Sequence, residues 1–391
     1  MASATSRPEA VLDELVASGR DPGCAVAVVR DGIVEVDHAA GTVDGRRPWT
    51  SDTLVMTYSV AKPFAALTVL DAVSSGALGL DDPVSSVWPD YARAGKAGTT
   101  VRHLLSHQAG LPAFGDAAAT VEYDDHEALV ALLAAATPVH EPGTAVAEHA
   151  LTYGHLLGEV LRRATGEELA ARFARITAAC GWDLHLQLDE RDLDRVAIVE
   201  EVLPSWRSDY ENDPRWGPSM GRPPGLLDTD VLNSARFRRT SFPAVALHAS
   251  ALGLARFYDD VHREDGQVAE RLGAELWRAY LAPAAAGHDL VLDRDVVWTL
   301  GFQREEEDGR LEIGMGGAGG CSAWTEPTAR YGAAFVSRGL GRHDPGRGRV
   351  AGRAERLHAA HGVNRGREVR ASSPPRRCEA LPCDPAYSRV R

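Results

Sequence analysis

Lysine is almost absent from this sequence. Only two of the 42 basic residues, Lys62 and Lys96, are lysine, and the other 40 are arginine. Arginine stays protonated in proteins, whereas a buried lysine amine can lose its proton near neutral pH. Because the chain uses arginine wherever it needs only positive charge, each retained lysine is a candidate for a role that arginine cannot fill.

Long apolar runs and metal-ligand motifs are also missing. No apolar run approaches the roughly 18 to 20 residues that span a bilayer. Residues 1–22 lack the basic and apolar regions of a secretory signal, so we expect a cytoplasmic protein without membrane contact. The 14 histidines form no metal-binding motif, and we expect neither a metal nor a cofactor. The five cysteines lack metal-site spacing, and their odd number predicts free thiols at Cys24, Cys180, Cys321, Cys378 and Cys383.

Charge is distributed unevenly along the 391 residues. The formal net charge is −13, although residues 341–391 carry 12 arginines and only five acidic residues. Residues 1–340 therefore hold a net charge of −20, and such an acidic body argues against nucleic-acid binding. The Gly-, Arg- and Pro-rich composition of residues 341–391 predicts a disordered, basic C-terminal tail after a domain at residues 1–340.

The order of strand and helix patterns predicts an α+β fold. Two β-branched runs around Asp31-Gly32 are typical of a hairpin. Helical periodicity follows at residues 60–77 and dominates the middle of the chain up to a last helix at residues 246–263. We expect a sheet completed by both chain ends, with helices inserted between them. The later strand patterns lie at residues 297–303, 311–314, 321–325 and 331–337.

The strongest chemical motif is Ser59-Val60-Ala61-Lys62, at the start of a helical pattern. A serine in the first helical turn has backbone N–H groups beside it that can stabilise an oxyanion. Lys62 is three residues further on, so it lies on the same helical face within reach of the Ser59 hydroxyl. If the amine is buried and neutral it can accept the Ser59 proton, and the pair therefore predicts a Ser-Lys nucleophile.

Two other motifs fit catalytic patterns but lack the required context. Gly217-Pro-Ser219-Met-Gly221 matches G-x-S-x-G, yet no strand pattern precedes it as a nucleophile elbow requires. Gly314-Met-Gly316-Gly-Ala-Gly319 matches G-x-G-x-x-G, yet a strand pattern follows where a dinucleotide site needs a helix N-terminus. We therefore do not assign the first motif a nucleophile or the second a dinucleotide-binding role.

Seven segments of the chain together carry a family resemblance. They are residues 21–32, Tyr58-Ser-Val-Ala-Lys62, residues 79–84, 101–112, 149–159 and 251–258, and Gly314-Met-Gly-Gly-Ala-Gly-Gly320. In this order they resemble the serine β-lactamase and penicillin-binding-protein superfamily, specifically class C β-lactamase-related serine hydrolases, including family VIII-type esterases. The resemblance covers about residues 21 to 338, which makes it more specific than the Ser-x-x-Lys motif alone.

The resemblance implies a β-lactamase-like fold and assigns roles to residues. The fold is an antiparallel sheet flanked by helices, from about residues 20–62 and 240–340, with a mostly helical insert at about residues 63–239. The active site lies between the two parts. By resemblance, Ser59 is the acylated nucleophile and Lys62 its general base. The substrate and oxyanion site is expected to include Tyr58, His149, Met315, Gly316 and Gly317.

Two positions depart from the family pattern. The tyrosine of the second motif falls at Glu148, and the basic residue of the third motif falls at Met315. Glu148 beside Lys62 favours the protonated amine, or is itself the base, or is a solvated residue at a helix start. Tyr153, about one turn further on, is an alternative source of the missing phenol. A thioether at Met315 cannot bind a substrate carboxylate, which argues against β-lactams and D-Ala-D-Ala peptides.

These residues together predict a serine hydrolase that acts on a small-molecule ester or related acyl substrate through an acyl-enzyme. An acyltransferase of the same fold differs only in the acceptor that deacylates the enzyme, and a β-lactamase or D-Ala-D-Ala carboxypeptidase-like activity is a further alternative. A rival from another class is a catalytically degenerate binding homologue that has kept Ser59 and Lys62. The sequence leaves the oligomeric state open.

Overall fold

The computed structural model describes residues 8–341 apart from residue 308. The predicted tail, with Cys378 and Cys383, lies outside these residues, and the three cysteines within them form no disulfide bond. None of the helices in the described part of the chain combines the length and the apolar character that a membrane crossing needs. The cytoplasmic location stays a prediction from the sequence.

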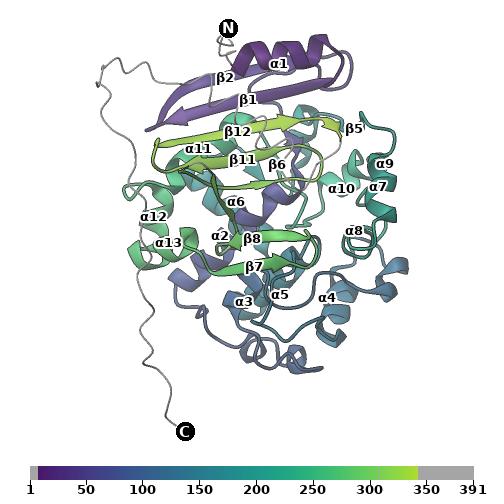
Figure 1. The fold of residues 1–391 in the computed structure, drawn as a ribbon, viewed down its shortest axis with the longest axis vertical. Coiled ribbons are helices and arrows are strands. Elements are labelled where there is room, and N and C mark those ends of the chain that lie inside the picture. Colours follow the sequence, from purple (N-terminus) through teal and green to yellow (C-terminus); the bar gives the residue numbers. More distant parts are fainter. Residues whose placement is uncertain (1–7, 308, 342–391) are drawn as a thin grey trace, which may run out of the picture.

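An eight-stranded antiparallel sheet runs through the molecule in the order β2-β1-β12-β11-β10-β9-β8-β7 (Figure 1). Strands from both ends of the chain meet where β1 pairs with β12, which confirms the predicted α+β fold. The strands are β1 (Gly23–Arg30), β2 (Ile33–Gly41), β7 (Ala285–Asp289), β8 (Arg294–Trp298), β9 (Gln303–Glu307), β10 (Arg310–Gly316), β11 (Ser322–Glu326) and β12 (Tyr331–Ser337). Short strands form two smaller sheets, one of β3 (Val55–Met56), β4 (Leu184–His185) and β6 (His248–Ala249), the other of β5 (Glu200–Glu201) and β13 (Gly339–Leu340).

Local turn chemistry explains where the strand predictions hold and where they fail. Asp31 and Gly32 have φ values of +49° and +80°, the conformation of the predicted two-residue hairpin turn. The predicted strand at residues 297–303 is wrong, because a turn divides it into the end of β8 and the start of β9. Gly301, with a φ of +129°, lies in that turn and is its only local signal.

The helices cover the sheet and fill the middle of the chain. α11 packs against β1, β11 and β12, and α1 packs against β1 and β2 (Figure 1). The predicted helix at residues 246–263 is shorter than expected, because its first residues form β6. The helices are α1 (Pro8–Ala17), α2 (Lys62–Ser74), α3 (Val101–Leu105), α4 (His126–Ala135), α5 (Thr152–Thr165), α6 (Leu169–Cys180), α7 (Trp206–Asn212), α8 (Trp216–Met220), α9 (Thr229–Leu232), α10 (Ala235–Arg238), α11 (Ala251–Val261), α12 (Gln267–Leu272) and α13 (Ala274–Leu281).

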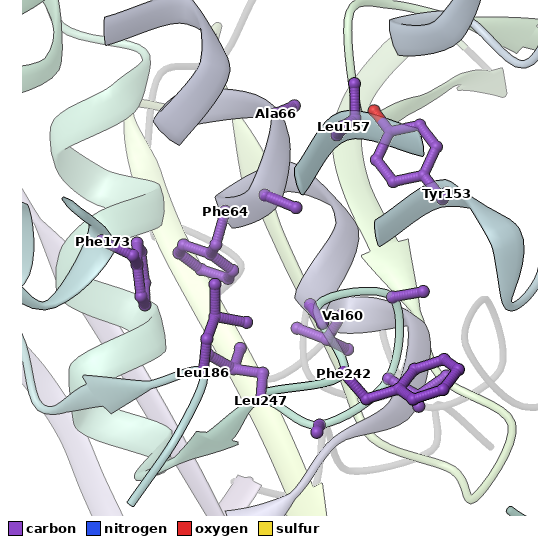
Figure 2. Close-up of a cluster of buried hydrophobic side chains, with 14 of the residues drawn as sticks. Val60, Phe64, Ala66, Tyr153, Leu157, Phe173, Leu186, Phe242 and Leu247 are labelled. Atoms are coloured by element: carbon purple, nitrogen blue, oxygen red, sulfur yellow. The ribbon is translucent and has the colours of Figure 1, made fainter. Parts of the chain in front are cut away.

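The helix that follows the Ser-x-x-Lys motif, α2, is buried on every side. Each residue from Lys62 to Leu70 is buried, as expected of a helix at the centre of a large domain. Figure 2 shows Phe64 of α2 beside Phe173 of α6, and the two ring centroids are 5.8 Å apart. This packing makes α2 a rigid support for the residues at its N-terminus.

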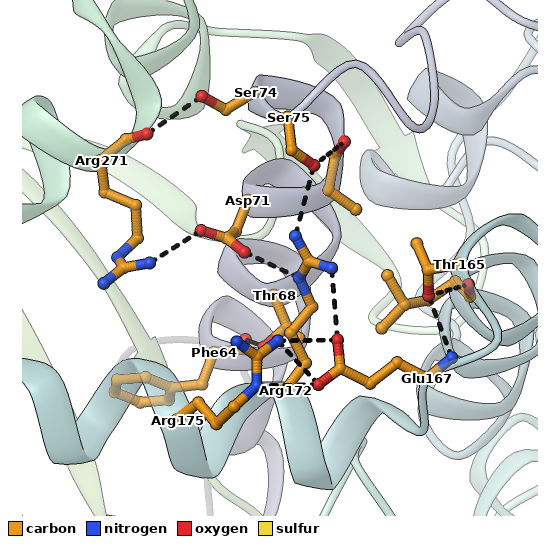
Figure 3. A network of polar contacts seen from close by, with 12 residues as sticks. Phe64, Thr68, Asp71, Ser74, Ser75, Thr165, Glu167, Arg172, Arg175 and Arg271 are labelled. Carbon is orange, nitrogen blue, oxygen red and sulfur yellow. Dashed lines mark hydrogen bonds and ion pairs between the residues drawn. The ribbon is translucent and has the colours of Figure 1, made fainter.

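A polar network fixes the other end of α2 (Figure 3). Asp71 accepts a hydrogen bond from Arg172 Nε of α6 at 2.7 Å and another from Arg271 Nη1 of α12 at 2.9 Å. Both arginine side chains are less than a third exposed, so solvent screens these ion pairs less than surface pairs. The network ties α2 to two neighbouring helices.

Lys96 has a structural role that its sequence context did not reveal. Its side chain is fully buried, and Nζ donates to the backbone carbonyls of Arg93, Ala134 and Ala136. The last two carbonyls belong to the C-terminal end of α4, where backbone acceptors lack helical donors. One ammonium directs three N–H groups at three carbonyls, which a planar guanidinium cannot do.

We predict that Lys96→Arg lowers the free energy of unfolding by about 2 kcal/mol, because at least one buried carbonyl loses its donor. Chemical denaturation measures the change. The matched control is Arg20→Lys, at an exposed residue whose ion pair with Glu14 should contribute less than about 0.5 kcal/mol. An equal effect of the two substitutions would contradict the capping role of Lys96.

Buried histidines predict a loss of stability in mild acid. Burial lowers the pKa of His149, His155 and His248 to about 3. In the unfolded chain these groups protonate near pH 6.5, so below that pH the unfolded state binds more protons and stability falls. Each histidine contributes about 1.4 kcal/mol per pH unit, or about 4 kcal/mol per unit for the three, down to pH 3. The raised pKa of Glu148 acts in the opposite direction and offsets part of one contribution.

Urea denaturation at pH 7, 6 and 5 tests this prediction. We expect the unfolding free energy to fall steeply between pH 6 and 5, and His155→Gln to reduce the slope by about 1.4 kcal/mol per pH unit. A free energy of unfolding that is constant from pH 7 to 5 would show that these histidines are not held neutral.

Candidate active site

Ser59 lies in a backbone turn that holds a strained residue. It belongs to the 3-10 turn η1 (Tyr58–Ala61), which leads directly into α2. Tyr58 has a φ of +51°, in the left-handed region that tyrosine rarely adopts, and such strain persists only where the surroundings maintain it. N–H groups at the start of a helix lack helical acceptors, so the Ser59 N–H is available to an oxyanion.

The end of β10 approaches this turn very closely. A Cβ atom on Gly317 would lie 2.0 Å from the Thr57 carbonyl oxygen and 3.2 Å from Cβ of Tyr58. The first distance is far shorter than real Cβ contacts and the second is unusually tight, so glycine is required at this position. The small residue of the third motif therefore lets β10 line the nucleophile turn.

Ser59, Lys62 and Glu148 form a continuous chain of polar groups. Lys62 Nζ donates a hydrogen bond to Ser59 Oγ at 2.6 Å and lies 3.2 Å from Glu148 Oε1. Lys62 is fully buried, and Ser59 and Glu148 are 8% and 4% exposed. The structure thus brings three of the predicted residues together. The alternative in which Glu148 is a solvated residue is wrong, because its carboxylate is buried against Lys62.

Burial moves the pKa values of Lys62 and Glu148 toward each other. It lowers the pKa of Lys62, and the nearby Glu148 charge opposes this shift. It raises the pKa of Glu148; Lys62 opposes that rise, and the charge of Asp289 adds to it. A proton therefore passes from Lys62 to Glu148 at a smaller free-energy cost than between the same groups in water.

Asp289, a residue that the sequence did not single out, positions Glu148. Its Oδ1 accepts the Glu148 N–H at 3.0 Å and also the N–H groups of Val291 and Leu292. Its Oδ2 accepts from Nε1 of Trp298 at 3.1 Å. The buried carboxylate therefore joins the segment that carries Glu148 to β7 and β8. No local pattern could reveal this contact, because 141 residues separate Glu148 from Asp289.

The turn after β10 corrects the expected oxyanion donor. The N–H of Gly317 donates to the Cys321 carbonyl at 2.8 Å, so it cannot also bind an oxyanion. The next N–H along the chain, that of Ala318, donates to no acceptor within the described residues. Ala318 rather than Gly317 therefore has the unoccupied N–H that an oxyanion site needs together with the Ser59 N–H.

Met315 supplies no charge to the site, as its side chain predicts. It is buried in an apolar cluster with Val146, Val296 and Trp298. β9 pairs with β10 only as far as Gly314, so Met315 and Gly316 have no strand partner on that side among the residues that the structure describes. Their backbone forms an open edge beside Ser59. The charge of Arg294, on β8, lowers the pKa of Glu148, but its guanidinium pairs with Glu305 at 3.2 Å.

The structure does not support a substrate-binding role for His149. Its ring is fully buried, Nδ1 donates to the Ala147 carbonyl at 2.8 Å, and Nε2 accepts the Leu111 N–H at 3.2 Å. Burial keeps the ring neutral, which leaves one donor and one acceptor, and the backbone occupies both. The neighbouring His107 also makes a structural contact, since its Nδ1 accepts the His149 N–H at 3.0 Å.

The two tyrosines assigned to the site are also occupied elsewhere. The Tyr58 hydroxyl donates to the Leu226 carbonyl at 3.1 Å. The Tyr153 hydroxyl donates to the Leu105 carbonyl at 3.0 Å, within a fully buried environment. Each phenol hydroxyl is therefore hydrogen-bonded to a backbone carbonyl. Neither tyrosine replaces the family tyrosine whose position Glu148 occupies in this chain.

No group of three or more His, Cys, Asp or Glu side chains within the described ranges is arranged to hold a metal ion.

Known proteins match both the sequence and the fold. The profile of the family described as Beta-lactamase matches residues 9–358. The chain is 35% identical over 153 residues to the esterase/beta-lactamase LipL of Mycobacterium tuberculosis, a match that covers 39% of this chain and 35% of that protein. This segment spans only about a third of the relative's length.

Two solved structures match nearly the whole chain. A penicillin-binding protein homologue from Caulobacter crescentus superposes with a TM-score of 0.75 and 30% identity, over 90% of this chain and 94% of that one. A family VIII carboxylesterase superposes with a TM-score of 0.75 and 26% identity, over 92% and 98%. Each match thus covers at least nine-tenths of this chain.

Proposed function

The chain belongs to the beta-lactamase family of serine hydrolases, and we propose that it hydrolyses small neutral esters through an acyl-enzyme on Ser59. The observation that carries the proposal is the buried chain in which Lys62 Nζ lies 2.6 Å from Ser59 Oγ and 3.2 Å from Glu148 Oε1. The resemblance to esterases of the same fold supports an ester as the substrate.

In the acylation step, Ser59 Oγ attacks the ester carbonyl carbon. Lys62 accepts the proton of Ser59 Oγ and at the same time donates one of its own protons to Glu148. Glu148 is therefore the final proton acceptor. The oxyanion binds to the N–H groups of Ser59 and Ala318. When the carbon–oxygen bond of the ester breaks, Lys62 protonates the leaving alkoxide and recovers a proton from Glu148.

In the deacylation step, water attacks the acyl-enzyme carbonyl, and the same proton path operates. Water gives its proton to Lys62 while Lys62 passes one to Glu148. As the bond between the acyl carbon and Ser59 Oγ breaks, Lys62 returns a proton to the serine. The acid is released and the starting protonation state is restored.

The charges near Ser59 favour a neutral substrate over a carboxylate. Met315 occupies the position where the family has a cation, and Arg294 is paired with Glu305. A substrate carboxylate at this site would face the charges of Glu148 and Asp289, while Lys62 and Arg294 are already paired with Glu148 and Glu305, so its desolvation would not be compensated.

A comparison of substrates tests the proposal. We expect the protein to hydrolyse p-nitrophenyl esters of short acids with a kcat/KM at least about 100-fold above that for nitrocefin, which carries a carboxylate. A serine-directed fluorophosphonate should add one adduct per chain by intact-mass spectrometry. Comparable turnover of nitrocefin would contradict the preference for neutral esters. A folded protein that is neither labelled nor active would instead be a degenerate binding homologue.

A further inference from the structure

The turn that follows β10 receives two side-chain donors from a single helix. Trp206 Nε1 donates to the Ala318 carbonyl at 3.2 Å, and the Tyr210 hydroxyl reaches the same oxygen at 3.4 Å. The two residues are four apart on α7, so they occupy one face of that helix. A carbonyl oxygen has two lone pairs, and these donors take both.

Both side chains also lie near the catalytic machinery. The Trp206 ring packs against Tyr58, the residue before the nucleophile, with the centroids 5.9 Å apart. Tyr210 lies close enough to Glu148 for the carboxylate charge, added to burial, to raise the pKa of the phenol. Its hydroxyl therefore stays protonated and remains a donor. α7 thus forms one wall of the site, beside the oxyanion turn.

The occupied carbonyl has a consequence for substrates that contain an amide. The open edge of β10 ends at Gly316, and Ala318 lies two residues further on, in the turn. A substrate that pairs along this edge as an antiparallel strand therefore has Ala318 at the end of its path. In one type of antiparallel pair, two residues exchange both of their N–H···O=C hydrogen bonds. A substrate whose reacting carbonyl accepts the Ala318 N–H would donate its own amide N–H to the Ala318 carbonyl. In this protein that acceptor is already taken.

We propose that Trp206 and Tyr210 determine specificity by occupying the Ala318 carbonyl, so that the enzyme gains nothing from an amide N–H beside the scissile ester. N-acylamino acid esters then lose the hydrogen bond that the sheet edge would otherwise offer them, and plain esters lose nothing. This inference rests on the proposed ester hydrolysis at Ser59. It narrows the substrate class to esters that lack an acylamino group on the acid side.

The test compares two esters that differ by one hydrogen-bond donor. The p-nitrophenyl ester of N-benzoylglycine has an amide N–H, whereas that of N-benzoyl-N-methylglycine has none. We expect the ratio of their kcat/KM values to be within about threefold of one for the wild-type enzyme. In Trp206→Phe/Tyr210→Phe, which frees the carbonyl, the ratio should shift about fivefold to tenfold toward the N–H ester, as one hydrogen bond allows.

Controls separate this role from a merely structural one. Trp216→Phe alters the same aromatic cluster, where Trp216 packs on Tyr210 at 5.7 Å, and should leave the ratio unchanged. Because Trp206 is buried, Tyr210→Phe alone is the milder variant, and it should shift the ratio in the same direction by a smaller factor.

Two outcomes would overturn the inference while the proposed function stands. One is a wild-type preference of tenfold or more for the N–H ester, and the other is an unchanged ratio in the folded double variant. A wild-type protein that hydrolyses neither ester, nor any plain p-nitrophenyl ester, would overturn the proposed function and this inference with it.

Discussion

Lys62→Arg should lower kcat/KM for ester hydrolysis by about 10³-fold while the chain keeps its fold. Arginine preserves the positive charge that Glu148 faces, but it does not give up a proton near neutral pH. Because Lys62 lies between Ser59 Oγ and Glu148 Oε1, a residue that cannot change its protonation state breaks the proton path at its centre. Steady-state hydrolysis of p-nitrophenyl butyrate, with single-turnover acylation, measures the loss.

The second lysine provides the matched control. Lys96→Arg makes the same substitution at a buried lysine that binds only backbone carbonyls. It should cost stability but leave kcat/KM of the folded protein within about threefold of wild type. Lys62→Met, which removes the charge without adding volume, keeps the test valid if arginine is too large for the buried position. More than a tenth of wild-type activity in folded Lys62→Arg would contradict a proton-transfer role.

Glu148→Gln should lower kcat/KM by about 10²-fold at neutral pH and change the acidic limb of the pH profile. Glutamine can still accept a hydrogen bond from Lys62, but it cannot take the proton. In the wild-type enzyme the carboxylate form is required, so activity falls as the pH drops through the Glu148 pKa. Burial raises that pKa above the usual value for glutamate, so the fall should occur at a higher pH than for an exposed carboxylate.

In the Glu148→Gln variant, the acidic limb of the pH profile should report the titration of a different group, Lys62. Lys62 loses the charge that opposes the lowering of its pKa, so its pKa falls further and it titrates alone. The control is Glu159→Gln, at a buried glutamate on α5 that pairs with Arg162 and Arg163 away from Ser59. A pH profile of Glu148→Gln that matches wild type in height and shape would show that the carboxylate is a bystander.

The parts of the fold that could be predicted are those determined by residues that lie close together in the sequence. The β1–β2 hairpin depends on Asp31-Gly32, and the proximity of Ser59 and Lys62 depends on a three-residue spacing on one helix. Turns inside apolar runs could not be located from the sequence. The pattern of residues 297–303 predicts one strand, and Gly301 is the only residue in it that indicates the turn. The strand β7 left no clear periodicity at all.

The rest of the site depends on contacts between distant segments. Asp289 meets Glu148 across 141 residues, and Trp206 meets Ala318 across 112. No spacing rule relates such residues. For the same reason the family position of His149 indicated nearness to the site, but not that backbone groups occupy both of its ring nitrogens. The role of Lys96 was equally hidden, because its carbonyl partners on α4 lie 38 and 40 residues away.

The most direct test of the account is to trap the acyl-enzyme and locate it. Mixing the protein with a p-nitrophenyl ester, quenching in acid and measuring the intact mass should show a gain of one acyl group, mapped to Ser59 by peptide analysis. Ser59→Ala should abolish the gain, whereas Ser219→Ala, in the G-x-S-x-G sequence, should not affect it. A gain that persists in Ser59→Ala, or ester hydrolysis by that variant at the wild-type rate, would contradict Ser59 as the nucleophile.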